Sequence, residues 1–186
     1  ETHHNKITHI TNIRQIFQEE YVWMDRFTTR NLELFQPTNL NGVALIDVLD
    51  LTLTAMGGRM LKHWMAFPER NLSKIEGRLS VVEAFKNDDS IHNKMQSHLK
   101  EIVDMERIIA KIATQKISPR ALVQLGKSLD QINIVKDDLL NHSSKNLQIL
   151  GSRFLEPAKV IKLIQSTLKS DRSEEHTSEL QSPVTI

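Results

Sequence analysis

The most regular pattern in this chain lies in residues 119–140, where large apolar side chains recur every three or four positions. That spacing places them on one face of an α-helix. Ser118 is a suitable N-cap, and Pro119 suits the first helical position, where a backbone N–H would have no helical partner. The stripe consists of Leu122, Leu125, Leu129, Ile132 and Leu139. It is shorter than the three or four heptads of a coiled coil, so it indicates core packing rather than a seam for a partner.

The same spacing predicts helices in most of the remaining chain. The predicted segments are 44–51, 54–67, 71–86, 91–115 and 157–168, with a short amphipathic helix within 1–20 and a helical turn after residue 25. Side chains that can cap the following helix precede four of them: Asp25, Thr54, Asn71 and Ser90. Pro68 is expected to end the helix before it. About seven helices joined by short loops are therefore expected.

The composition also favours helices. The chain has only 6 Gly and 5 Pro, and aromatic residues make up 5% of it. Residues 21–24 form a short β-prone run, but Asp25 ends it, and no segment is long enough for a strand of a sheet. We predict an all-α fold, an elongated bundle or stack of helices.

Several classes of function are disfavoured by the residues that the chain lacks. It has no cysteine, so disulfides and thiolate metal sites are excluded. The net charge of +1 gives no strong signal for binding a polyanion, and no apolar run reaches the length of a membrane span. No signal peptide is recognisable, and no phosphate-binding loop or nucleophile motif is present. His3, His4 and His9 are close in sequence, but without matching ligands elsewhere they are interpreted as surface residues rather than a metal site.

The two ends of the chain differ from its middle. The chain begins at Glu1 without a methionine, which suggests a fragment, and residues 1–24 are interpreted as a lead-in to a core of residues 25–171. Residues 172–186 are polar and lack apolar periodicity, so a disordered tail is expected. The stretch from Arg172 to Ser182 resembles the translation of a common sequencing adapter, which predicts that this tail is an artefact.

Three arginines and two glycines are the candidate functional residues. Arg26 and Arg30 are four positions apart, so a helix would place both on one face, and Arg59 lies in a second basic spot. They are candidates for contacts with phosphate or for anchoring an interdomain junction through their planar guanidinium groups. Gly57 and Gly58 lie inside the first turns of a predicted helix, where close packing against a neighbouring element would compensate their low helix propensity.

Two acidic residues form a further candidate cluster. Asp104 and Glu106 lie beside Arg107, and Asp104 is one helical turn from it, so a helix-surface ion pair between Asp104 and Arg107 is the simplest expectation. A general acid–base role would need a pocket and a partner, and the sequence indicates neither.

Four stretches of the chain carry a resemblance to a known family. They are Thr28–Leu34, residues 45–68 with their Met-Gly-Gly-Arg segment, Asp104–Arg107, and Pro119-Arg120 with Leu122. Together they resemble the core, or lever, domain of the MutS family of DNA mismatch-repair proteins. The resemblance covers roughly residues 1–170 in order. Thr29 and Ala55 depart from the family's usual arginine and proline, respectively.

The resemblance implies a non-catalytic region of a cytoplasmic DNA-repair ATPase, with no cofactor of its own. The mismatch-reading domain would precede Glu1, while most of the DNA clamp and the ATPase domain, with ATP and magnesium, would follow Ser170. The lever would couple binding of mismatched double-stranded DNA to an ATP-driven conformational change. Other MutS domains would be its partners, within a homodimer.

Two other functions remain open at the level of sequence. One is a stand-alone helical scaffold that binds proteins through its apolar stripes. The other is a MutS-like protein without a mismatch-reading domain, which acts on other DNA structures. Sequence upstream of this chain would separate that homologue from a mismatch-repair protein, because only the latter is expected to carry a Phe-x-Glu mismatch wedge.

Overall fold

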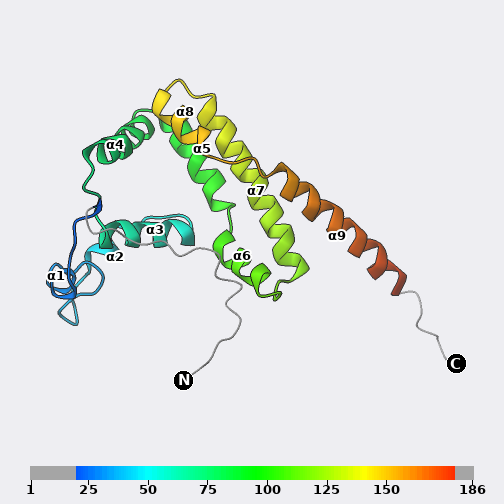
Figure 1. Cartoon of the computed structure of the whole chain (residues 1–186), viewed down its shortest axis with the longest axis horizontal. Helices are drawn as coiled ribbons and strands as arrows, with labels where there is room; N and C mark the ends of the chain where they lie inside the picture. Colours follow the sequence, from blue (N-terminus) through cyan, green and yellow to red (C-terminus); the bar gives the residue numbers. More distant parts are fainter. Residues whose placement is uncertain (1–19, 179–186) are drawn as a thin grey trace.

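The computed structural model describes residues 20–178, with the side chains of residues 20–168. These residues contain nine α-helices and, in place of a sheet, one isolated antiparallel bridge between Tyr21 and Glu69 (Figure 1). The helices are α1 (Arg26–Asn31), α2 (Leu45–Leu49), α3 (Ala55–Ala66), α4 (Leu72–Lys86), α5 (Asp89–Lys100), α6 (Met105–Ala113), α7 (Pro119–Leu140), α8 (Lys145–Ser152) and α9 (Ala158–Ser178). The predicted all-α class is confirmed.

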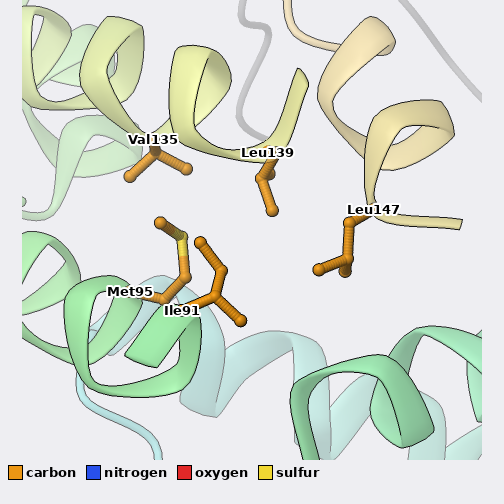
Figure 2. Close-up of a cluster of buried hydrophobic side chains, with 5 residues drawn as sticks. All are labelled: Ile91, Met95, Val135, Leu139 and Leu147. Carbon is orange, nitrogen blue, oxygen red and sulfur yellow. The ribbon is translucent and has the colours of Figure 1, made fainter. Parts of the chain in front are cut away.

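Helix α7 is the element on which most of the others are assembled, since it packs against α5, α6, α8 and α9. One buried cluster lies near its C-terminal end, where side chains from α5, α7 and α8 point toward one another (Figure 2). The cluster consists of Ile91, Met95, Val135, Leu139 and Leu147. Val81 and Phe85 of α4 pack against it. Burial of one such side chain stabilises a fold by about 1.5–3 kcal/mol.

A second cluster joins α6, α7 and α9. Ile108, Leu125 and Ile164 are buried together, with Leu122 and Leu129 packed around them. Four members of the apolar stripe predicted in residues 119–140 therefore lie in or against these two clusters. The interpretation of that stripe as core packing is confirmed.

Most predicted caps are present. The side chains of Asp25, Thr54, Asn71 and Ser118 each accept a hydrogen bond from a backbone N–H in the first turn of the following helix. The prediction of Ser90 is wrong, because Asp88 caps α5, accepting from Ser90 N at 2.9 Å and Ile91 N at 3.2 Å. A carboxylate accepts from both N–H groups, whereas the Ser90 N–H is itself one of the donors in need of a partner.

Residues 91–115 do not form the single helix that was predicted. α5 ends at Lys100 and α6 begins at Met105, with Asp104 as its N-cap. The fully buried hydroxyl of Ser128 on α7 accepts a hydrogen bond from Val103 N at 3.0 Å. The backbone N–H at the break between the two helices therefore has an acceptor on another helix. Apolar spacing continues across this break, which is why periodicity alone predicted one helix.

The C-terminal part of the chain also contains more helix than predicted. α8 was not predicted at all, and α9 begins after Pro157 as expected but continues to Ser178 rather than ending at Leu168. The first residues of the predicted tail are therefore helical. The rest of that tail, and the helix and histidines predicted before Glu20, lie outside the described residues.

Candidate functional site at the junction of α3 and α6

The stretch Thr28–Leu34 forms α1 and the sharp turn that follows it. The Glu33 N–H donates to Arg30 O at 3.0 Å, and the Leu34 N–H donates to Thr29 O at 3.2 Å. This is the Schellman arrangement, which requires a left-handed residue after the helix; Glu33 has φ 49°. Leu34 is then buried, with 8% of its surface exposed. The role of this stretch in the structure is to reverse the chain.

The turn after α1 caps α2 with backbone atoms. The N–H groups of Leu45 and Ile46 donate to the carbonyl oxygens of Glu33 and Leu34 at 2.9 and 3.0 Å. The Asp47 carboxylate accepts from Ala44 N at 3.2 Å, and Ala44 and Ile46 are both buried. The first two family-like stretches thus form one hydrogen-bonded unit.

Gly57 and Gly58 lie against the loop between α2 and α3. A Cβ on Gly58 would be 3.2 Å from Thr52 Oγ1 and 3.3 Å from Asp50 Oδ2, and one on Gly57 would be 3.1 Å from Thr54 Oγ1. The close neighbours are thus side chains of the preceding loop rather than another helix. Hydrogen bonds from the Thr52 hydroxyl and backbone N–H hold the pKa of Asp50 below its usual value.

Arg59 connects α3 to the first turn of α6. Its Nη1 and Nη2 donate to the two Asp104 oxygens at 2.9 and 2.6 Å, while Nε and Nη2 donate to Glu106 Oε2 at 2.8 and 2.5 Å. We call this group of three side chains the fork. The Arg59 hydrogen bonds hold the pKa of Asp104 below its ordinary value, although partial burial of that carboxylate opposes them. A planar guanidinium matches two carboxylates in this way, and a lysine would not.

The expected pair of Asp104 with Arg107 is a minor contact. Arg107 Nε is 4.0 Å from Asp104 Oδ2, and the Arg107 side chain is 82% exposed. Both Asp104 oxygens instead accept hydrogen bonds from Arg59. Asp104 Oδ1 also accepts from Arg107 N at 3.3 Å, as the N-cap of α6. The helical spacing predicted the Arg107 contact correctly but did not identify the stronger partner, which is distant in sequence.

Arg26 and Arg30 are not part of the fork. Both are exposed on α1 and make no side-chain hydrogen bond or ion pair with another described residue. Figure 1 shows α1 remote from α6. Their predicted role as phosphate or interdomain contacts remains a prediction.

An acidic residue that was not predicted stabilises residues 67–71, which join α3 to α4 and which we call the elbow. The Glu69 side chain is only 4% exposed, and its Oε1 accepts from the N–H groups of Arg70 and Asn71, both at 3.2 Å. Arg78 of α4 lies over the ring of Trp64 on α3, 4.2 Å from its centroid. The only feature of the sequence that could have indicated this role of Glu69 is its position two residues before Asn71, the N-cap of α4.

Within residues 20–178, whose side chains are described as far as residue 168, no cluster of the described histidine and carboxylate side chains has the arrangement of a metal site. No helix in that range is both long and apolar enough to cross a membrane.

The sequence of the chain is similar to those of known proteins. A family model described as MutS domain III matches residues 27–182. The DNA mismatch repair protein MutS of Flavobacterium psychrophilum is 44% identical over 171 residues, 92% of this chain and 20% of that protein. The MutS of Christiangramia forsetii is 48% identical over 151 residues, 81% of this chain and 17% of that protein. The chain therefore spans about a fifth of the length of these relatives.

Proposed function

The chain belongs to the MutS family, and on that premise we propose that it is a non-catalytic lever of a cytoplasmic DNA mismatch-repair protein. It would couple the binding of mismatched double-stranded DNA to an ATP-driven conformational change. ATP and magnesium would bind elsewhere in the whole protein, which would act as a homodimer. The partners of this chain would then be the other MutS domains.

One observation carries this proposal, a continuous series of contacts from α1 to α7. The carbonyls of Glu33 and Leu34 hold α2, and Arg59 of α3 holds α6. Ile108 of α6 is buried against Leu125 of α7. Helices joined by such discrete contacts move as stiff elements between packed arrangements, which is the property that a lever needs.

Exposed apolar surface favours a lever over a stand-alone scaffold. Large apolar side chains on α1, after α2 and on α4 are well exposed, among them Phe27 at 76%, Leu51 at 85% and Leu79 at 61%. Where such exposed side chains adjoin one another, the apolar patch that they form is usually covered by a partner. In a lever, the partners are other parts of the same protein.

The coupling proposal is tested in a full-length chimera. Residues 27–171 replace the matching segment of the Flavobacterium psychrophilum MutS, and ATP hydrolysis is measured with mismatched and with fully paired DNA. We expect the chimera to respond to the mismatch and Gly58→Leu to lose that response, because the new side chain would collide with Thr52 and Asp50.

A matched control separates this effect from a general loss of helix packing. Gly77→Leu introduces the same side chain into α4, where no atom lies within 4 Å of the new Cβ. It should respond as the unmodified chimera does. If Gly58→Leu retains the full response to the mismatch, the coupling proposal is wrong.

A further inference from the structure

The segment that contains α1–α3, residues 26–66, is joined to the rest of the described chain in two places. We call this segment the arm. One connection is the elbow of residues 67–71 together with the adjoining α4. Val22 N donates to Pro68 O at 2.8 Å, Arg70 N donates to Glu20 O at 3.2 Å, and Arg78 of α4 lies over the Trp64 ring of α3. The other is the fork. Among residues 20–168, every hydrogen bond and ion pair between the arm and α5–α9 comes from Arg59.

The arm contributes nothing to the two buried clusters of the helical body. Both clusters, and the apolar side chains packed around them, come from residues 81–168. The buried residues of the arm are Leu34, Ala44 and Ile46, which lie around α2. The described contacts between α3 and α6 are the hydrogen bonds of the fork. Figure 1 shows α3 directed toward α6, while α4 leads away from it.

A polar contact of this kind can open without unfolding either side. The side chains of Arg59, Glu106 and Asp104 are 44%, 66% and 18% exposed, so none is fully buried and water can solvate all three when they separate. Salt screens exposed charges, with a Debye length of about 3 Å at 1 M. Opening apolar clusters would instead expose large areas and cost much more.

We propose that the fork is a detachable latch that holds the arm against α6 and allows it to turn about the elbow when the fork opens. This inference concerns the chain itself and does not depend on the coupling function proposed above.

The position of Asp104 makes the latch sensitive to movement of α7. The Asp104 carboxylate accepts hydrogen bonds from Arg59 and is also the N-cap of α6. α6 is fixed to α7 through Ile108 and Leu125, and Ser128 of α7 accepts the N–H of the residue before Asp104. A displacement of α7 would therefore carry the carboxylates with it and change their distance from Arg59, while the arm is held at its other end by the elbow and by the Arg78–Trp64 contact.

The latch can be tested by distance measurement, because the chain contains no cysteine. Spin labels are attached at Met60→Cys on α3 and Lys127→Cys on α7, both exposed positions, and their separation is measured by pulsed electron resonance. Unsubstituted at position 59, the chain should show one narrow distance distribution at low salt. In Arg59→Gln, the ratio of closed to open arms should fall about threefold to tenfold, as expected for loss of a bidentate, partly exposed ion pair.

Further variants distinguish a latch from a general structural defect. Arg107→Gln removes a neighbouring charge that contributes little to the fork, so its distribution should match the unmodified one. Asp104→Asn keeps a capping side chain but removes the charge, and it should open the arm as Arg59→Gln does. Circular dichroism must show the same helix content in each.

Salt provides a test that needs no substitution in the fork. Raising the salt concentration to about 1 M should open the arm of the unmodified chain but have no further effect on Arg59→Gln. The proposal is overturned if Arg59→Gln leaves the distance distribution unchanged, or if salt shifts both proteins equally.

Discussion

The same substitution is expected to have opposite effects on stability at two glycines of this chain. Gly151 lies near the end of α8, where a Cβ would be 3.0 Å from Leu139 Cβ and 3.2 Å from Leu140 N. Gly77 lies in the middle of α4, where a Cβ would have no neighbour within 4 Å. Alanine at Gly151 must therefore displace α8 from α7, whereas alanine at Gly77 displaces nothing.

Two opposing effects determine how much each substitution changes the free energy of unfolding: the higher helix propensity of alanine and the cost of overpacking. Alanine stabilises a helix interior over glycine by about 1 kcal/mol, and the gain is smaller near a helix end. Overpacking a site costs about 1–3 kcal/mol, and here the neighbours are a Cβ and a backbone nitrogen, which cannot rotate away. Gly77→Ala should raise the free energy of unfolding by about 1 kcal/mol. Gly151→Ala should lower it by about 1 kcal/mol.

Thermal unfolding followed by circular dichroism measures both effects. For a chain of this size, 1 kcal/mol changes Tm by about 2–4 °C, so the two variants should differ by about 4–8 °C. Gly126→Ala is a useful third variant, since its Cβ would be 3.5 Å from Ile164 Cγ2, an ordinary contact. We expect it to be neutral or mildly stabilising. If Gly151→Ala raises Tm as much as Gly77→Ala does, the close approach of α7 and α8 is not rigid and the reasoning fails.

Three further substitutions test individual contacts. Ser128→Ala should destabilise the chain in urea by about 1–2 kcal/mol, because the Val103 N–H loses its acceptor; an unchanged midpoint would contradict this. Gln115→Gly should stabilise it by about 0.5–1 kcal/mol, since this residue has φ 56° after α6, and an increase in Tm is the readout. The hydrogen bond from His142 holds the pKa of Asp88 below its ordinary 3.8. The Asp88 carboxylate therefore stabilises the fold fully above about pH 3.8, and this stabilisation is lost as the pH falls through the lower pKa of the folded state. Asp88→Asn keeps the cap of α5 and should weaken this acid dependence in melts between about pH 7 and pH 2; an unchanged profile would show that the pair contributes nothing.

Local signals in the sequence predicted the parts of the fold that depend on local chemistry. Ser118 and Pro119 begin α7 as expected, and Thr54 begins α3 because its hydroxyl accepts from Gly57 N at 3.0 Å. Apolar spacing predicted α7 well, since Leu125 and Leu139 lie on the side that meets the other helices. These features need only neighbours within a few residues, so the sequence contains all the information.

Features that depend on distant residues could not be predicted in this way. The break between α5 and α6 requires Ser128, which supplies an acceptor from another helix. The pairing of Arg59 with Asp104 joins residues that are far apart in sequence. The sequence indicated both groups as charged clusters but could not show that they meet.

The fork shows how a cluster of charged side chains can resemble an active site and yet be fully used in holding two helices together. Asp104 has a lowered pKa, a property often found in catalytic residues, yet its oxygens are occupied by Arg59 and by the first turn of α6. A carboxylate whose lone pairs serve structural donors is not available to a substrate. Asp104 is charged at neutral pH, and its lowered pKa extends that charge to more acidic solution, so the attraction to Arg59 persists and is changed by moving a helix or by screening. The strength of that attraction therefore depends on the position of α6, because α6 carries both Asp104 and Glu106 toward Arg59.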